Sequence, residues 1–214
     1  MKTIEQPGTA RSRRTREALL SATRTILEHD GFGALTMTAV AEHAGVTRRA
    51  AYMHFRTRAE LVGALFDYMA DVERLPQSLA PVWAAPDAAA ALDQWAAHLA
   101  HYHPRLLAVD RALRSVRDHD DDAAAHYARV IKEQLANCHR LAQRLAQENQ
   151  LAAPWTVDSA RDMLFALISS DLIGALIEDR KWSRKRLADH LAILLRSTFT
   201  APQRNAPHRR PPSE

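Results

Sequence analysis

Apolar residues recur along the chain at the three- and four-residue spacing of a helix, and Pro and Gly separate the blocks. The first block covers residues 11–29 and places Leu19, Ala22 and Ile26 on one face before it stops at Gly31. Eight more blocks follow at about residues 37–45, 47–55, 57–74, 87–102, 105–117, 122–150, 157–179 and 183–199. No segment reads as a convincing strand, so the pattern predicts an all-α fold of about nine helices.

Hydroxyl residues stand where several of these helices begin. Thr36 and Thr47 are predicted N-caps, because a Thr hydroxyl accepts a hydrogen bond from a free backbone N–H of the first turn. The run from Thr57 to Glu60 predicts a capping box, in which the Thr hydroxyl and the Glu carboxylate satisfy each other's backbone donors.

Proline marks the predicted domain boundaries. The stretch from Pro76 to Pro86 is expected to break helix and to link an N-terminal domain, residues 1–74, to a C-terminal domain, residues 75–200. Residues 201–214 are rich in Pro and Arg and are predicted to be a disordered tail.

The composition changes this picture mainly by exclusion. Six glycines in 214 residues argue against strand-rich folds and phosphate-binding loops. A single Cys forms no disulfide framework, no apolar run reaches about 18 residues, and the first residues lack a signal-peptide pattern, so a cytoplasmic location is expected. We find no nucleophile–base arrangement and no paired catalytic carboxylates, so neither an enzyme nor a bound cofactor is predicted.

The charge is unevenly distributed. Residues 1–60 hold ten Lys and Arg against six Asp and Glu, an excess of +4, and four of these arginines fall within residues 11–16. Residues 61–203 carry −2, with sixteen basic and eighteen acidic residues. This asymmetry is equally consistent with a polyanionic partner for the first segment and with a solubilising N-terminus.

The second and third blocks have the pattern of a helix-turn-helix. Ala44, Gly45 and Val46 join them: Gly45 permits a left-handed turn, Ala44 allows close approach of the helices, and Val46 fills the junction. A short second helix with a hydroxyl cap and polar first residues suits the major groove of DNA.

The same residues carry a resemblance to a known family. The run Leu35 to Thr47, then Tyr52-Met53-His54-Phe55 and Arg58-Ala59-Glu60-Leu61, resembles the N-terminal domain of the tetracycline-repressor-like (TetR-type) regulators, over about residues 11–66. It implies a three-helix DNA-binding domain joined to a helical domain for ligand binding and dimerisation. The chain departs from the family pattern at Arg49, Ala51 and Arg58, where a small residue, a larger aliphatic residue and Lys are usual.

The candidate DNA contacts follow partly from chemistry and partly from the resemblance. Arg is the commonest partner of guanine in the major groove, helix N-termini favour phosphates, and an Arg-rich arm adds salt-sensitive contacts. Tyr52 and His54 correspond to the positions at which the family contacts the phosphates and sugars of DNA. The full set is Arg13, Arg14, Thr36, Thr38, Thr47, Arg48, Arg49, Tyr52, His54 and Arg58.

The C-terminal half is expected to dimerise. Residues 163–177 are apolar almost all round, which predicts a helix buried on two sides, and small residues recur in it every four positions. Together with the last helix it predicts half of an intersubunit four-helix bundle, as the resemblance also implies. The predicted interface residues are Ala166, Ser170, Gly174, Leu187, Leu191 and Leu194.

The middle helices, residues 87–150, are expected to enclose a cavity for a small effector of unknown identity. Amphipathic or polar side chains on otherwise apolar stripes are the candidate ligand contacts. They are Trp95, Tyr102, Tyr127, Asn137, Cys138, Phe165 and Asp171, the last a carboxylate within an apolar run.

An alternative function is metal-dependent or metal-sensing, through His98, His101 and His103. His98 and His101 share a helix face, as metal ligands would. All three also lie in a last helical turn before Pro104, where His is favourable without a metal. The preferred hypothesis is a homodimeric repressor that binds a palindromic double-stranded DNA operator, contacts no membrane, and is released by its effector.

Overall fold

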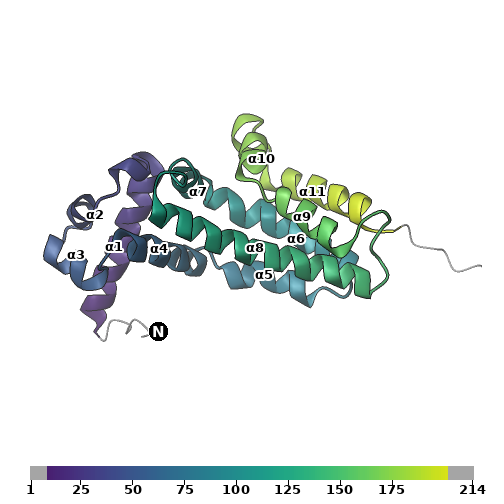
Figure 1. Ribbon diagram of the computed structural model, residues 1–214, viewed down its shortest axis with the longest axis horizontal. Coiled ribbons are helices and arrows are strands. Elements are labelled where there is room, and N and C mark those ends of the chain that lie inside the picture. The colour runs from purple at the N-terminus through teal and green to yellow at the C-terminus, as the bar shows by residue number, and fades with distance from the viewer. Residues whose placement is uncertain (1–8, 202–214) are drawn as a thin grey trace, which may run out of the picture.

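The computed structural model of the protein describes residues 9–201, which form eleven α-helices joined by short turns (Figure 1). The expectation of an all-α fold is confirmed. The predicted tail lies outside the described residues apart from Ala201. No helix of the described chain is long and apolar enough to cross a membrane.

The helices fall into a short N-terminal group and a longer bundle. The first group is α1 (Ala10–His29), α2 (Met37–His43), α3 (Arg48–His54) and α4 (Arg58–Val72). The bundle is built from α5 (Leu75–Ala84), α6 (Ala88–Tyr102), α7 (Leu107–Arg114), α8 (Asp121–Gln147), α9 (Val157–Ala166), α10 (Ser170–Gly174) and α11 (Arg184–Phe199).

The predicted hydroxyl caps form, with one difference. Thr36 and Thr47 accept hydrogen bonds from the N–H groups of Ala39 and Ala50, both at 3.1 Å, and so begin α2 and α3. Thr57 caps α4 in the same way, but the Glu60 carboxylate accepts from the N–H of Arg56 at 2.6 Å and not from Thr57. The expected capping box is therefore wrong in its second half.

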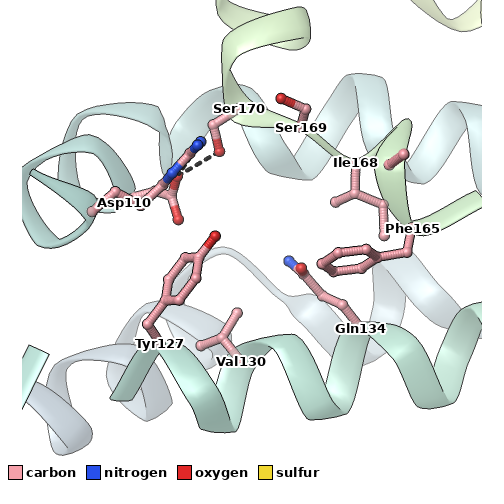
Figure 2. A pocket seen from close by; sticks show the side chains of 10 residues that line it. Asp110, Tyr127, Val130, Gln134, Phe165, Ile168, Ser169 and Ser170 are labelled. Carbon is pink, nitrogen blue, oxygen red and sulfur yellow. Dashed lines mark hydrogen bonds and ion pairs between the residues drawn. The ribbon is translucent and has the colours of Figure 1, made fainter. Parts of the chain in front are cut away.

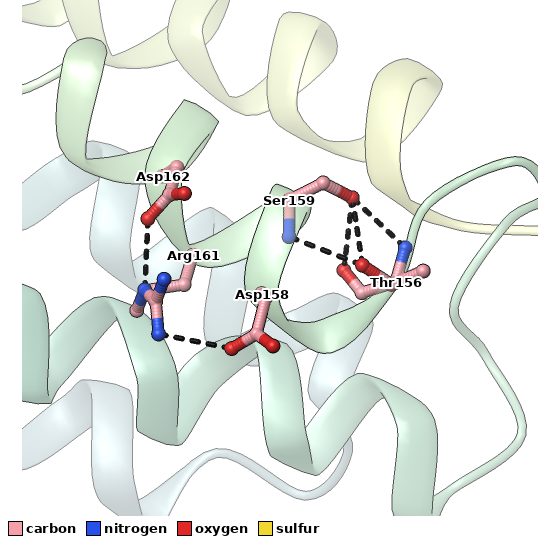
Figure 3. A network of polar contacts seen from close by, with 5 residues as sticks. All are labelled: Thr156, Asp158, Ser159, Arg161 and Asp162. Carbon is pink, nitrogen blue, oxygen red and sulfur yellow. Dashed lines mark hydrogen bonds and ion pairs between the residues drawn. The ribbon is translucent and has the colours of Figure 1, made fainter.

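A reciprocal capping box begins α9 instead. Thr156 Oγ1 accepts from the Ser159 N–H, and Ser159 Oγ accepts from the Thr156 N–H at 3.0 Å (Figure 3). In the same turn Arg161 bridges Asp158 and Asp162 at 2.9 and 2.8 Å. These contacts fix the start of a helix that carries part of the cavity wall.

The segment predicted as a linker is a helix. Pro76 lies in the first turn of α5, where its missing N–H costs no intrahelical bond. Pro81 lies inside the helix but on its exposed side, while Val82 is fully buried and Leu79 packs against the core. Packing of this apolar face outweighs the lost hydrogen bond, so the prediction of a helix break was wrong.

The segment predicted as one helix from about 157 to 179 is divided. α9 ends at Ala166, α10 runs from Ser170 to Gly174, and a π-helical turn follows. Ser170 Oγ donates to the Asp110 carboxylate of α7 at 2.5 Å, and Gly174 lies directly against the Arg111 guanidinium. Contacts with α7 thus hold α10 away from the α9 axis (Figure 1).

Buried apolar side chains form two clusters. The first joins α1 to α4 and also contains Val109 and Leu113 of α7 and Ala123 of α8. The second lies mainly among α5, α6, α8, α9 and α11, where it includes Trp95 and Phe199, and it also contains Leu107 of α7 and Ile173 of α10. Because α8 contributes to both, it connects the two ends of an elongated molecule (Figure 1).

Candidate nucleic-acid interface and ligand cavity

The helix-turn-helix expected from the sequence is present. Gly45 joins α2 to α3 with a φ of 64°, a left-handed conformation that a residue with a Cβ adopts only at a cost. The Val46 N–H donates to the Ala41 carbonyl at 3.0 Å and closes the turn. Val40 and Ala51 are fully buried between the helices, so the opposite side of α3 is presented outward.

The exposed side of α3 carries the side chains that suit DNA. Arg48, Arg49, Tyr52 and Met53 are all exposed, and the Arg48 guanidinium lies over the Tyr52 ring at 5.5 Å from its centroid. Met53 is 80% exposed and was missed by sequence reasoning. Its place one helical turn after Arg49 was the available signal, since residues four apart share a face.

The other predicted contacts lie around this face. Thr38, Arg13 and Arg14 are exposed, near the starts of α2 and α1. His54 is half-buried, and its pKa is lowered by burial and by the positive charge of Arg16. A neutral His54 at neutral pH can donate a hydrogen bond to a phosphate but adds no charge.

Arg58 faces the bundle, contrary to expectation. Its guanidinium pairs with Asp120, lies 3.6 Å from Asp122, and covers the Phe32 ring at 4.7 Å. Two carboxylates neutralise its charge, so we correct its assignment as a phosphate contact. Asp120 also caps α8 by accepting from the Ala123 N–H at 3.0 Å.

Two adjoining cavities lie within the bundle. One of about 210 Å³ is bounded by α7, α8, the end of α9 and the start of α10, and one of about 160 Å³ by α4, α5, α6 and α8. They share Asp110, Val130, Gln134 and Ser170, so a ligand could extend from one into the other. Their combined size suits a small molecule.

Five of the seven candidate ligand residues line these cavities. Tyr127 and Phe165 line the larger, and Trp95, Tyr102 and Asn137 the smaller. Figure 2 shows the Tyr127 hydroxyl and the Gln134 amide directed into the space beside the Asp110–Ser170 hydrogen bond. Asp110 of α7 and Gln134 of α8 were missed because the helical pattern does not show which helices enclose a cavity, and Ser170 because it was assigned to the dimer interface.

Two candidate ligand residues lie elsewhere and are corrected. Cys138 is fully buried in the second core cluster, and burial raises the pKa of its thiol to about 12. Asp171 is 73% exposed and pairs with Arg114 at 3.1 Å. Neither lines a cavity described above.

The three histidines of the metal-binding alternative either make other contacts or are exposed. His98 is buried, its Nδ1 is 2.8 Å from Ser78 Oγ, and its ring stacks on Tyr102. Burial lowers the pKa of His98 to about 3 and that of His103 to about 4, whereas His101 is exposed. Within residues 9–201 no three His, Cys, Asp or Glu side chains are grouped to hold a metal ion.

The residues predicted to form the dimer interface do not share one exposed surface. Leu187 and Leu191 are buried in the core of their own chain at 0% and 4% exposure, and Gly174 is covered by Arg111, so these three offer no surface to a partner. Ser170 bonds Asp110, and Ala166 is exposed. Leu194 is 43% exposed, as are Met163 of α9 at 43% and Ile193 of α11 at 66%.

Comparisons with known proteins agree with this geometry. Residues 19–65 match the family described as "Bacterial regulatory proteins, tetR family", which confirms the resemblance found in the sequence. A comparison with curated proteins gives no match.

Solved structures share the fold over most of the chain. NalD of Pseudomonas aeruginosa, the secondary repressor of the MexAB-OprM multidrug efflux pump, is 20% identical with a TM-score of 0.68, covering 90% of this chain and 99% of its own. FadR of Bacillus subtilis, solved with stearoyl-CoA, is 18% identical with a TM-score of 0.69, covering 85% and 98%. A putative regulator of Saccharomonospora viridis, solved with choline, is 13% identical with a TM-score of 0.68, covering 87% and 98%. At these identities the likeness establishes the fold.

Proposed function

We propose that this protein, which belongs to the TetR-type regulators by its residues 19–65 and its fold, is a homodimeric repressor that a small molecule releases from its operator. The observation that carries the proposal is the outward face of α3. It presents Arg48, Arg49, Tyr52 and Met53 from a helix-turn-helix whose other face is locked into the core.

Each of these side chains has a defined use in a major groove. Arg48 and Arg49 lie in the first turn of α3, where a guanidinium can form two hydrogen bonds with guanine O6 and N7. Met53 offers an apolar surface to the methyl group of thymine. Arg13 and Arg14, on α1, add contacts to phosphates that carry no sequence information.

Dimerisation completes the DNA site, because one short helix contacts few base pairs. A two-fold pair of α3 helices would read half-sites about 34–36 Å apart. Met163, Ile193 and Leu194 form the exposed apolar surface of α9 and α11, and we place the dimer interface there. The division between DNA-binding and effector-binding domains at residue 74 is part of the same proposal.

Effector release requires a ligand that binds one conformation more tightly than the other. The cavities against α8 provide its site. Solved structures of this fold contain stearoyl-CoA and choline, which supports binding of small molecules by such a bundle.

The test is binding of the full chain to duplex DNA taken from upstream of its own gene, measured over a range of salt concentrations. We expect a protected palindrome and an affinity that falls steeply with salt. Arg48→Ala or Arg49→Ala should cost about 1–3 kcal/mol at one base position and relax specificity there. Arg180→Ala, which removes an exposed arginine far from α3, is the control and should leave binding unchanged. Salt-insensitive binding, or none to any duplex, would contradict the proposal.

A further inference from the structure

The charged side chains around the two cavities are unbalanced. Arg129 lies between Asp67 at 3.5 Å and Glu133 at 3.8 Å. Arg114 lies between Asp171 at 3.1 Å and Asp110 at 4.0 Å. Each guanidinium is thus shared by two carboxylates. Asp171 lies outside the cavities, and the five side chains that line them carry a net charge of −1.

No neighbouring group offsets this excess. His98 and His103 line the smaller cavity, and both are neutral at pH 7 because burial lowers their pKa to about 3 and about 4. Arg117 covers the Tyr127 ring at 4.6 Å but is itself paired with Asp118 at 3.5 Å. An arriving ligand therefore meets negative charge.

Asp110 is the carboxylate best placed to act on a ligand. It lines both cavities and is 25% exposed, so water screens it less than the outer carboxylates. Ser170 Oγ fixes its Oδ2 at 2.5 Å (Figure 2). This hydrogen bond holds the carboxylate in place before any ligand arrives.

The rest of the lining is largely aromatic. Phe66, Trp95 and Tyr102 line the smaller cavity, and Tyr127 and Phe165 the larger. Aromatic faces attract cations as well as apolar groups, and more strongly when water is excluded.

Trp95, which lines the smaller cavity, has a buried hydrogen-bond donor without a partner in the described chain. Trp95 is 2% exposed, and its Nε1–H has no hydrogen-bond acceptor among residues 9–201. This donor would be satisfied only by an acceptor atom, so it does not bear on the charge of the ligand, for which the carboxylates are the evidence.

We propose that the effector is an organic cation with an apolar body, whose positive nitrogen lies beside Asp110 and whose body packs against Tyr127, Phe165 and Trp95. This rests on the proposed function, in which the same cavities hold the effector. Three lining carboxylates against two guanidiniums disfavour anions and favour a single positive charge.

The test uses three probes of nearly equal shape: benzyltrimethylammonium, its neutral carbon analogue neopentylbenzene, and the anion phenylmethanesulfonate. Binding to the full chain is followed by tryptophan fluorescence. We expect the cation to bind about tenfold or more tightly than the neutral probe, and the anion most weakly.

Asp110→Asn tests the role of the carboxylate, because the amide oxygen can still accept from Ser170. It should weaken the cation about tenfold and leave the neutral probe unchanged. Glu178→Gln is the matched control: it removes an exposed carboxylate that pairs with Arg111 outside both cavities, and it should alter neither affinity.

Equal affinities, a preference for the anion, binding of no probe, or a uniform loss in Asp110→Asn would overturn the proposal. DNA binding is measured on the same preparations. A chain that binds its operator but prefers the anion loses only the cation assignment. A chain that prefers the cation but binds no duplex keeps the ligand class and loses the repressor function.

Discussion

The contact between Arg58 and Asp120 joins the start of α4 to the start of α8, and its removal should be measurable in stability but not in DNA contacts. The side chains are 34% and 18% exposed, and Arg58 also covers the Phe32 ring. An exposed ion pair contributes about 0.2–1 kcal/mol, and a hydrogen bond to a charged group about 1.5–3 kcal/mol. The partly buried position of this pair suggests about 1–2 kcal/mol, to which the ring contact adds about 0.5–1 kcal/mol.

We therefore expect Arg58→Ala to lower the free energy of unfolding by about 2 kcal/mol, with a double-mutant cycle isolating the pair. The partner variant is Asp120→Asn, because Asn still caps α8 while losing the charge. Urea unfolding at fixed protein concentration should give a coupling energy of about 1–2 kcal/mol. Asp122→Asn is the control: at 3.6 Å and 36% exposure it should couple by less than about 0.5 kcal/mol.

DNA binding provides the contrasting measurement. Each phosphate contact contributes about 0.9 to the slope of log affinity against log salt. Arg58→Ala should leave that slope unchanged, whereas Arg13→Ala and Arg14→Ala should reduce it. A coupling energy near zero, or a slope reduced by about one in Arg58→Ala, would refute the reasoning and restore Arg58 as a phosphate contact.

Three further predictions concern the bundle. Ile193→Asp should shift the chain from dimer to monomer in sedimentation while Gln94→Asp, on α6, leaves it dimeric; a monomeric parent protein would contradict the proposed interface. Below about pH 6.5 the free energy of unfolding should fall by up to about 1.4 kcal/mol per pH unit for each of His98 and His126. Their pKa values in the folded chain are lowered to about 3 and 4, so the unfolded chain takes up protons first. His126→Gln should flatten this dependence in acid titrations. Cys138 should resist alkylation in the folded chain and react on unfolding, because burial raises the pKa of its thiol to about 12; rapid labelling of the native chain would show that the core opens there.

Local patterns predicted the N-terminal helices well. Thr36 and Thr47 cap their helices, and Gly45 adopts the left-handed turn, because these features depend on a few neighbouring residues. The resemblance in this region added candidate contacts, of which the exposed positions on α3 remain predictions.

Tertiary contacts decided the features that the sequence did not reveal. Pro76 and Pro81 indicated a break, yet packing of Val82 keeps α5 helical. The apolar run after Val157 read as one helix, but Asp110 and Arg111 of α7 engage Ser170 and Gly174 and divide it.

The same dependence on tertiary contacts explains why the role of Arg58 was predicted wrongly. Arg58 lies 62 residues from Asp120 in the sequence, and a helix pattern gives no information about such a pairing. Tyr127 was found because it is an amphipathic side chain on the apolar stripe of α8. Asp110 and Gln134 also lie on regular helices and were missed because the pattern does not show which helices enclose the cavity, whereas Ser170 depends on the loop before α10.

The participation of α7 in the N-terminal core has a consequence for protein engineering. Val109 and Leu113 are almost fully buried in the cluster formed by α1 to α4, although they follow those helices by more than thirty residues. The DNA-binding end therefore cannot be moved to another protein on its own, because a fragment ending at residue 74 would expose the apolar surface that these side chains cover. A chimera that transfers the specificity of α3 to another bundle must carry the matching face of α7 as well, or rebuild it.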